Sequence, residues 1–181
     1  MAQPSKEMKA LLLECKEYGI NEKQLKARTE LILKTYQTKM YELMMEKEAR
    51  GSGNLQEEVI EDLYVLRDFR IATDSGAFRK AVRMVSGLGY LDEIIRTAMQ
   101  EMALKRSLGD LYYRILELKY GSREVEKDVF IANKVNLGHT KMSERKAEAM
   151  IAVGLEITVS TLPAATRELI AARKAYNYEK A

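Results

Sequence analysis

Apolar residues in this sequence recur three and four positions apart along most of the chain. Met8, Leu11, Leu12 and Cys15 are one example, and this spacing places side chains on one face of an α-helix. No stretch alternates apolar and polar residues long enough to predict a β-strand. The 181 residues contain only two prolines, ten glycines and no tryptophan. We therefore predict an all-α protein.

Glycines and polar turns divide the first part of the chain into predicted helices. Gly19 is expected to end the first helix, and Asn21 to cap a long second helix that reaches about residue 50. The clearest break in the chain is Gly51-Ser52-Gly53-Asn54. Further helices are predicted over residues 55–72, 78–85 and 91–106.

The helix over residues 21–50 leaves two interpretations open. Its length favours a helical hairpin or a helix that binds a partner. The alternative is a core-facing helix of a single bundle, because its apolar stripe is too irregular for a sustained heptad repeat.

The stretch from Asp128 to Met150 predicts two short helices joined by a tight turn. Ile131 and Val135 share a helix face, and Asn136 tolerates the left-handed conformation that ends a helix. Gly138 is an acceptable N-cap for the second helix. This layout is typical of a DNA-binding helix-turn-helix.

The second of these helices is expected to turn a polar face outward as far as Met150. We predict that residues in its first turns face bases and that Lys134, Arg145 and Lys146 contact phosphates. Glu144 either accepts a hydrogen bond from a cytosine amine or repels phosphate. The predicted DNA-binding residues are Lys134, His139, Thr140, Lys141, Ser143, Glu144, Arg145 and Lys146.

Two runs in this stretch carry a family resemblance: Ile131-Ala132-x-x-Val135-Asn136-Leu137 and Arg145-Lys146-x-Glu148-Ala149-Met150. With the preceding segment Leu111–Tyr120, they resemble the C-terminal part of ArpU-type phage transcriptional regulators. Those regulators are similar in turn to the sigma-70 region-4 domain that reads the −35 promoter element. The resemblance implies activation of late genes in a phage or prophage of a Gram-positive bacterium, close to RNA polymerase.

Charge is distributed unevenly along the chain. Residues 1–104 hold 16 basic and 17 acidic side chains, whereas residues 105–181 hold 14 basic and 10 acidic ones. A basic C-terminal part is the expected electrostatic footprint of a phosphate-contacting domain, although an excess this small also occurs on solvated helical surfaces.

Several other classes of protein are disfavoured. The single histidine, His139, and the single cysteine, Cys15, cannot supply a zinc-finger or His-rich metal site. Neither Gly-x-Gly sequence continues as a phosphate-binding loop. We expect no enzyme activity, no cofactor, no signal peptide and no membrane-spanning segment, and a protein of the host bacterial cytoplasm or nucleoid with a buried thiol at Cys15.

The last stretch predicts a separate helix. Ser160, Thr161 and Pro163 form a helix-start signal, so the preceding helix is expected to end near Ile157.

We therefore expect an N-terminal helical region over residues 1–106, which serves dimerisation or partner binding, and a helix-turn-helix domain with a C-terminal helix over residues 107–181. The predicted function is DNA-binding transcription regulation, with double-stranded DNA and RNA polymerase as partners and a homo-oligomer as the active form. The competing interpretation is a helical structural or interaction protein, such as a virion or assembly component, that does not bind DNA.

Overall fold

A computed structural model describes the chain except for residues 1–2, 46–54, 88–89, 123 and 181, and the described part is all-α. The predicted break at 51–54 lies outside the described residues. The helices, with η1 a π-helical segment, are α1 (Lys6–Glu17), α2 (Glu22–Met45), α3 (Leu55–Arg67), α4 (Gly76–Gly87), α5 (Tyr90–Lys105), α6 (Gly109–Tyr120), α7 (Asp128–Lys134), α8 (His139–Leu155), η1 (Glu156–Thr161) and α9 (Leu162–Lys180).

Local signals for helix ends are confirmed at the start of the chain. Ser5 caps α1 by accepting a hydrogen bond from the Met8 N–H, and Asn21 caps α2 by accepting one from the Gln24 N–H at 3.1 Å. Gly19 adopts φ 65°, and the following Ile20 N–H donates back to the Cys15 carbonyl at 2.8 Å. This left-handed termination turns the chain from α1 into α2.

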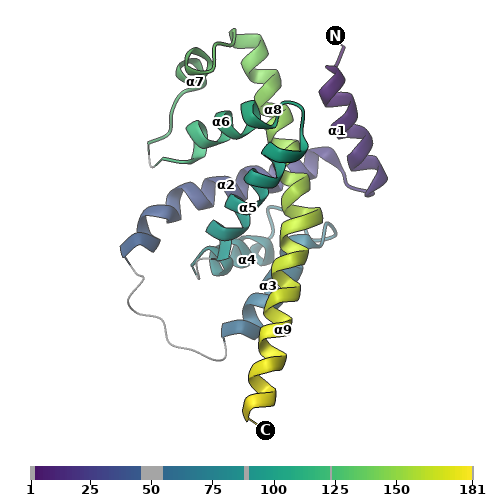
Figure 1. The fold of residues 1–181 in the computed structure, drawn as a ribbon, viewed down its shortest axis with the longest axis vertical. Helices are drawn as coiled ribbons and strands as arrows, with labels where there is room; N and C mark the ends of the chain where they lie inside the picture. The colour runs from purple at the N-terminus through teal and green to yellow at the C-terminus, as the bar shows by residue number, and fades with distance from the viewer. Residues whose placement is uncertain (1–2, 46–54, 88–89, 123, 181) are drawn as a thin grey trace.

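One continuous helix formed by α8, η1 and α9 runs through the molecule, and the other helices pack around it (Figure 1). The prediction that a helix ends near Ile157 and a new one begins at Pro163 is therefore wrong. Proline cannot donate to the carbonyl four residues earlier and clashes with it in a regular helix. The wider π-helical turns of η1 precede Pro163 and accommodate that defect without ending the helix. The Thr161 hydroxyl donates to carbonyls within η1 instead of capping a new helix.

The continuous helix from His139 to Glu179 is long and apolar enough to meet a length-and-composition test for a membrane span. In its most apolar window, 67% is buried inside the protein. About two thirds of this window therefore packs inside the fold.

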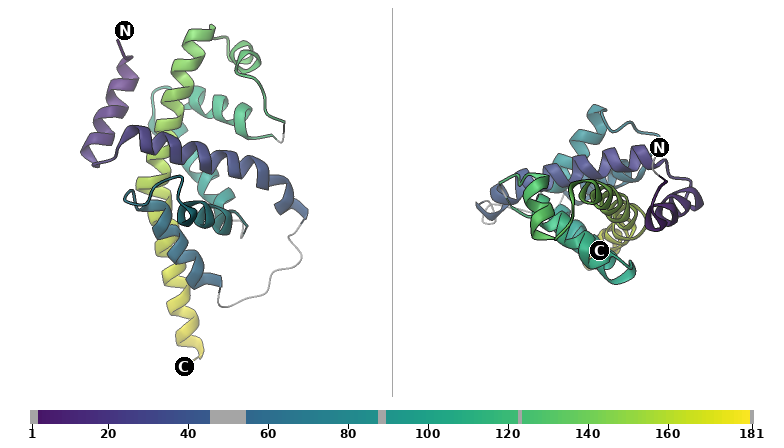
Figure 2. Two further views of the ribbon diagram at one scale, coloured as in Figure 1. Left: turned by 180° about the vertical axis from the view of Figure 1, so that it is seen from behind. Right: turned by 90° about the horizontal axis from the view of Figure 1, so that it is seen from above.

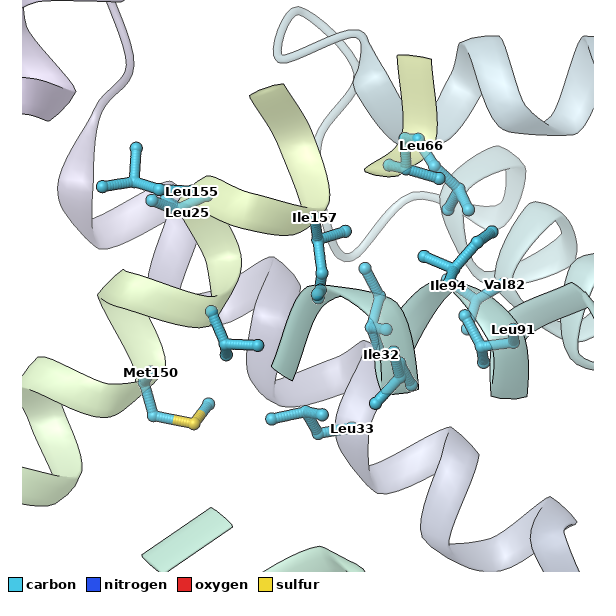
Figure 3. Packing of buried hydrophobic residues seen from close by; sticks show 14 of the residues in the cluster. Leu25, Ile32, Leu33, Leu66, Val82, Leu91, Ile94, Met150, Leu155 and Ile157 are labelled. Carbon is cyan, nitrogen blue, oxygen red and sulfur yellow. The ribbon is translucent and has the colours of Figure 1, made fainter. Parts of the chain in front are cut away.

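The main core contains residues from both sides of position 106, so the two predicted regions share one core. Figure 3 shows side chains of α2, α4, α5 and α8 meeting in it. Examples are Leu25 and Leu33 on α2, Ile94 on α5 and Met150 and Leu155 on α8. In the described part of α2, which ends at Met45, the helix is thus a core helix, as one of the two interpretations had it.

Helix α3 ends at Arg67, five residues before the predicted end at residue 72. A buried arginine of α2 binds the backbone at this point. The Arg28 side chain of α2 is only 2% exposed and donates to the carbonyls of Leu66, Asp68 and Ile71. Its guanidinium also lies 4.5 Å from the ring centroids of both Phe69 and Phe78. These carbonyls at the end of α3 gain their partners from another helix.

Candidate nucleic-acid interface

Three helices, α6, α7 and the start of α8, are joined by a small core of their own. Ile115, Ile131, Ala132 and Met142 are buried together there, with Leu137 packed against them. Ile131 and Ala132 come from α7, and Met142 comes from the first turn of α8. The apolar residues that predicted the helix-turn-helix therefore do meet in space.

The turn between α7 and α8 has the predicted left-handed residue. Asn136 adopts φ 56°, and it is the one non-glycine residue with positive φ in the described part of the chain. The Leu137 N–H donates to the Ala132 carbonyl at 2.9 Å, and the Asn136 N–H to Asn133 at 3.3 Å. These two bonds form a Schellman termination, which places Leu137 beneath the corner.

The start of α8 presents an exposed polar ridge, which we define as residues 139–146. His139, Thr140, Lys141 and Ser143 are exposed, and Glu144 is partly exposed. Gly138 precedes them in an extended conformation without a side-chain cap. The backbone N–H groups of the first turn therefore face solvent next to the ridge.

The ridge is shorter than the sequence predicts. Glu148 and every residue after it to Leu155 are buried, so the outward face does not extend to Met150. Ser5, which caps α1, and Tyr112 of α6 cover α8 at Glu148, and helix α2 crosses α8 further along, at Gly154. A Cβ on Gly154 would come within 3.1 Å of the Leu25 Cγ atom, and closer still to the Thr29 hydroxyl.

Arg145 does not face outward as predicted. Its side chain is 13% exposed, and its guanidinium lies 2.6 Å from the Glu148 carboxylate and 3.4 Å from that of Glu7. Glu148 is fully buried and also accepts hydrogen bonds from the hydroxyls of Ser5 and Tyr112. The guanidinium thus neutralises a buried carboxylate and is turned away from solvent.

Burial and the carboxylates shift several pKa values in this cluster. Burial, and then the hydrogen bond to Glu148, raise the pKa of the Tyr112 phenol. Burial opposes the charge of Arg145, but the hydrogen bonds and charges of Glu148 and the other neighbouring groups together outweigh it and raise the pKa of that guanidinium. A backbone hydrogen bond lowers the pKa of Glu7. These shifts keep Arg145 and Glu7 charged and Tyr112 neutral across the neutral pH range.

The three lysines of the predicted interface carry ion pairs in the free protein. Lys134 lies 2.6 Å from Glu126, and Lys141 lies 2.9 Å from Glu144. Lys146 pairs with Asp128. Lys134 and Lys141 are 50% and 52% exposed, and ion pairs this exposed contribute little. They can exchange a carboxylate for a phosphate at small cost.

Asp128, at the start of α7, holds two lysines at once. It accepts a hydrogen bond from Lys119 of α6 at 2.8 Å and another from Lys146 of α8. Burial opposes its charge, but these two bonds lower its pKa. Asp128 therefore joins the three helices of the unit electrostatically, and Lys146, 30% exposed, is only partly available.

Sequence reasoning did not identify Ser5, Tyr112, Asp128 and Glu148 as residues that organise this site. The available signal was the register of α8: Glu148 is adjacent to the inward-facing Ala149 and three residues after Arg145. Glutamate at such a position predicts a buried ion pair within one helix.

His139 is exposed. Among the described residues, it belongs to no group of three or more histidine, cysteine or acidic side chains that could hold a metal ion. Cys15 is 2% exposed, as expected for a structural thiol.

Comparisons with protein-family models, with curated proteins and with solved structures find no match to this chain.

Proposed function

We propose that this protein is a DNA-binding transcription regulator that places the start of α8 in the major groove. The observation that carries the proposal is the unit of α6, α7 and α8. It combines a small core, a left-handed turn at Asn136 and an exposed polar helix start. A helix-turn-helix needs these three features to present a recognition helix.

The dimensions of the ridge suit this role. An α-helix with its side chains is about 10 to 12 Å in diameter, which the major groove, about 12 Å wide, admits, and the eight residues of the ridge extend about 12 Å along the helix axis. His139, Thr140, Ser143 and Glu144 would then face base edges. The exposed Lys134 and Lys141 would contact phosphates, with Lys146 at the edge of the interface.

The resemblance to ArpU-type regulators refines the proposal to activation of phage or prophage late genes near RNA polymerase. A single module of this size binds weakly and with strong salt dependence. We therefore include a homo-oligomer or a polymerase contact in the proposal.

The test is a DNA-binding titration of the wild-type protein and the triple variant His139→Ala/Lys141→Ala/Ser143→Ala, with fluorescence anisotropy at low and high salt. All three side chains are exposed, so the variant should fold normally. We expect salt-sensitive binding by the wild type and at least a tenfold weaker complex for the variant. Equal binding by both proteins, or none by the wild type, would contradict the proposal.

An interaction protein without DNA binding is the second candidate, and one observation favours it. Val125, Val129 and Phe130, on α7 and the loop before it, are 67%, 55% and 55% exposed. Three large apolar side chains together on a surface suit protein–protein contact. Val129→Ser/Phe130→Ser should leave DNA binding intact if the regulator proposal holds.

A further inference from the structure

Helix α4 keeps one face apolar and the other strongly basic. Its buried side consists of Phe78, Ala81, Val82, Val85 and Ser86. Its exposed side carries Arg79, Lys80 and Arg83. The helix contains no acidic residue, so nothing within α4 offsets these three charges.

The three cations also lack partners elsewhere in the described chain. Other exposed cations do form ion pairs, such as Lys34 with Glu30 at 2.8 Å. Arg79, Lys80 and Arg83 form none with any residue that the structure describes. Like charges three and four positions apart repel one another, so this face is expected to attract an external polyanion.

The buried side of α4 packs against the first half of α2. The Arg28 guanidinium of α2 stacks on the Phe78 ring in the first turn of α4. On its solvent side, the same half of α2 carries Lys23 and Lys26, both exposed. The left view of Figure 2 shows α2 crossing α8, with α4 below it on the near side. We call the five exposed cations of α2 and α4 the flanking face.

The α2 part of the flanking face lies near the point where α2 crosses α8, beyond the end of the ridge. Helix α2 crosses α8 at Gly154, which is eleven residues, or about 16 Å, beyond Ser143. Helix α2 packs on α8 and α4 packs on α2, and these two helix spacings add at most about 16 to 20 Å. The axis of α4 thus lies within about 36 Å of the centre of the ridge, close to one turn of B-DNA, about 34 Å.

We propose that the flanking face is a second contact for the phosphate backbone of duplex DNA, beside the site where the ridge lies. This inference rests on the proposed function. It adds a surface that no helix-turn-helix argument predicts, in the part of the chain that sequence analysis assigned to dimerisation or partner binding.

The chemistry of the flanking face favours a nucleic acid over a membrane. A helix that binds the lipid interface inserts an apolar face beside its cations. The apolar face of α4 is buried within the protein. No large exposed apolar side chain is found on α4, or on α2 among the residues whose side chains are described. A purely charged surface suits the sequence-independent binding of phosphates.

The experiment compares Arg79→Ala/Lys80→Ala/Arg83→Ala with a control that removes the same charge elsewhere, Lys16→Ala/Arg167→Ala/Lys174→Ala. The control cations are exposed and lie at the end of α1 and on α9. Binding to a duplex of about three helical turns is titrated over a range of salt concentrations by anisotropy. Thermal melting followed by circular dichroism verifies that both variants are folded.

Each lost phosphate contact lowers the salt slope of log K by about 0.9. We expect the α4 variant to lose between one and three phosphate contacts, and to bind DNA on the order of 10- to 100-fold more weakly at low salt. The control should retain the wild-type slope. The charge-conserving variant Arg79→Lys/Arg83→Lys should keep the wild-type salt slope of log K, because lysine contacts phosphate as a point charge.

Four other results would overturn the inference. Equal losses in the α4 variant and the control would reduce the effect to net charge. If only the ridge variant lost DNA affinity, the flanking face would not contact DNA, and the proposed function would still hold. No DNA binding by the wild type would remove both. If the α4 variant instead lost only its binding to vesicles of anionic lipid, the flanking face would be a membrane contact.

Discussion

The buried carboxylate of Glu148 determines where the side chain of Arg145 points. Glu148 has no exposed side-chain area, so its charge must be neutralised within the protein. Arg145 supplies that charge from one turn earlier on α8. The polar ridge therefore loses one of its expected cations to the stability of the fold.

The substitution Arg145→Ala should lower the free energy of unfolding by roughly 3 kcal/mol, because it leaves a buried carboxylate without its cation. Lys141→Ala, on the exposed side of the same helix, should change it by less than about 0.5 kcal/mol. Urea denaturation measures both. Adding Glu148→Gln to Arg145→Ala should recover part of the loss, and a fully stable Arg145→Ala variant would contradict this role.

Tyr120 should make the protein sensitive to alkali. Burial, followed by the negative charges of Glu30 and Asp128, raises its pKa to about 12 from an ordinary value of 10. The neutral phenol therefore contributes stability that is fully present below pH 10 and is lost as pH rises through 12. Two pKa units correspond to at most about 2.7 kcal/mol.

Unfolding free energies measured from pH 9 to 12 should therefore fall for the wild type and fall less for Tyr120→Phe. Tyr112→Phe is not a clean control, because its hydroxyl donates to Glu148. Parallel pH profiles for the wild type and Tyr120→Phe would show that Tyr120 is not the titrating group.

Local residue types predicted what depends on local geometry. Asn136 was expected in the left-handed region from its side chain alone, and it is there. Arg145 was misplaced because the burial of its partner depends on α1 and α6. One of its acceptors, Glu7, is 138 positions away in the sequence. No pattern within the helix-turn-helix contains that information.

At the scale of elements, the crossing of α2 over α8 covers the part of α8 that follows the ridge, around Gly154. Gly154 permits the close approach, since any side chain there would meet Thr29 and Leu25. We expect Gly154→Ala to destabilise the protein by about 1 to 3 kcal/mol through overpacking, as measured by thermal or urea unfolding.

Gly76→Ala is the matched control, because a Cβ at Gly76 has no atom within 4 Å. In a helix this replacement should be neutral or stabilising by up to about 1 kcal/mol. Equal effects at the two glycines would mean that α2 does not pack closely on α8.

The boundaries of most helices followed from periodicity and caps, but the π-helical segment did not. Pro163 is compatible both with the first turn of a new helix and with a widened turn inside a long one. The sequence around Ser160 and Thr161 suits either. What decides is the burial of Leu155 before the segment, Ile157 within it and Leu162 after it, which depends on the other helices.

At the scale of the whole molecule, the shared core predicts that the chain unfolds as one unit. Residues 107–181 alone would lose the core partners of Ile151, Val153 and Leu155 that α2 and α5 supply. We expect that fragment to show reduced helicity and no cooperative melt, whereas the full chain melts in a single transition. An independently folded fragment would restore the division at residue 106.

The central claim is that the start of α8 lies against DNA, and a tethered nuclease tests it most directly. Cys15 is buried, and burial raises the pKa of its thiol, so an added exposed cysteine is labelled selectively. Lys134→Cys places an iron-EDTA group beside the ridge without covering it, and Lys174→Cys places one on α9. With protein bound to duplex DNA at low salt, we predict strand cleavage from position 134 and none from position 174. Cleavage from position 174 alone, or equal cleavage from both, would contradict the claim.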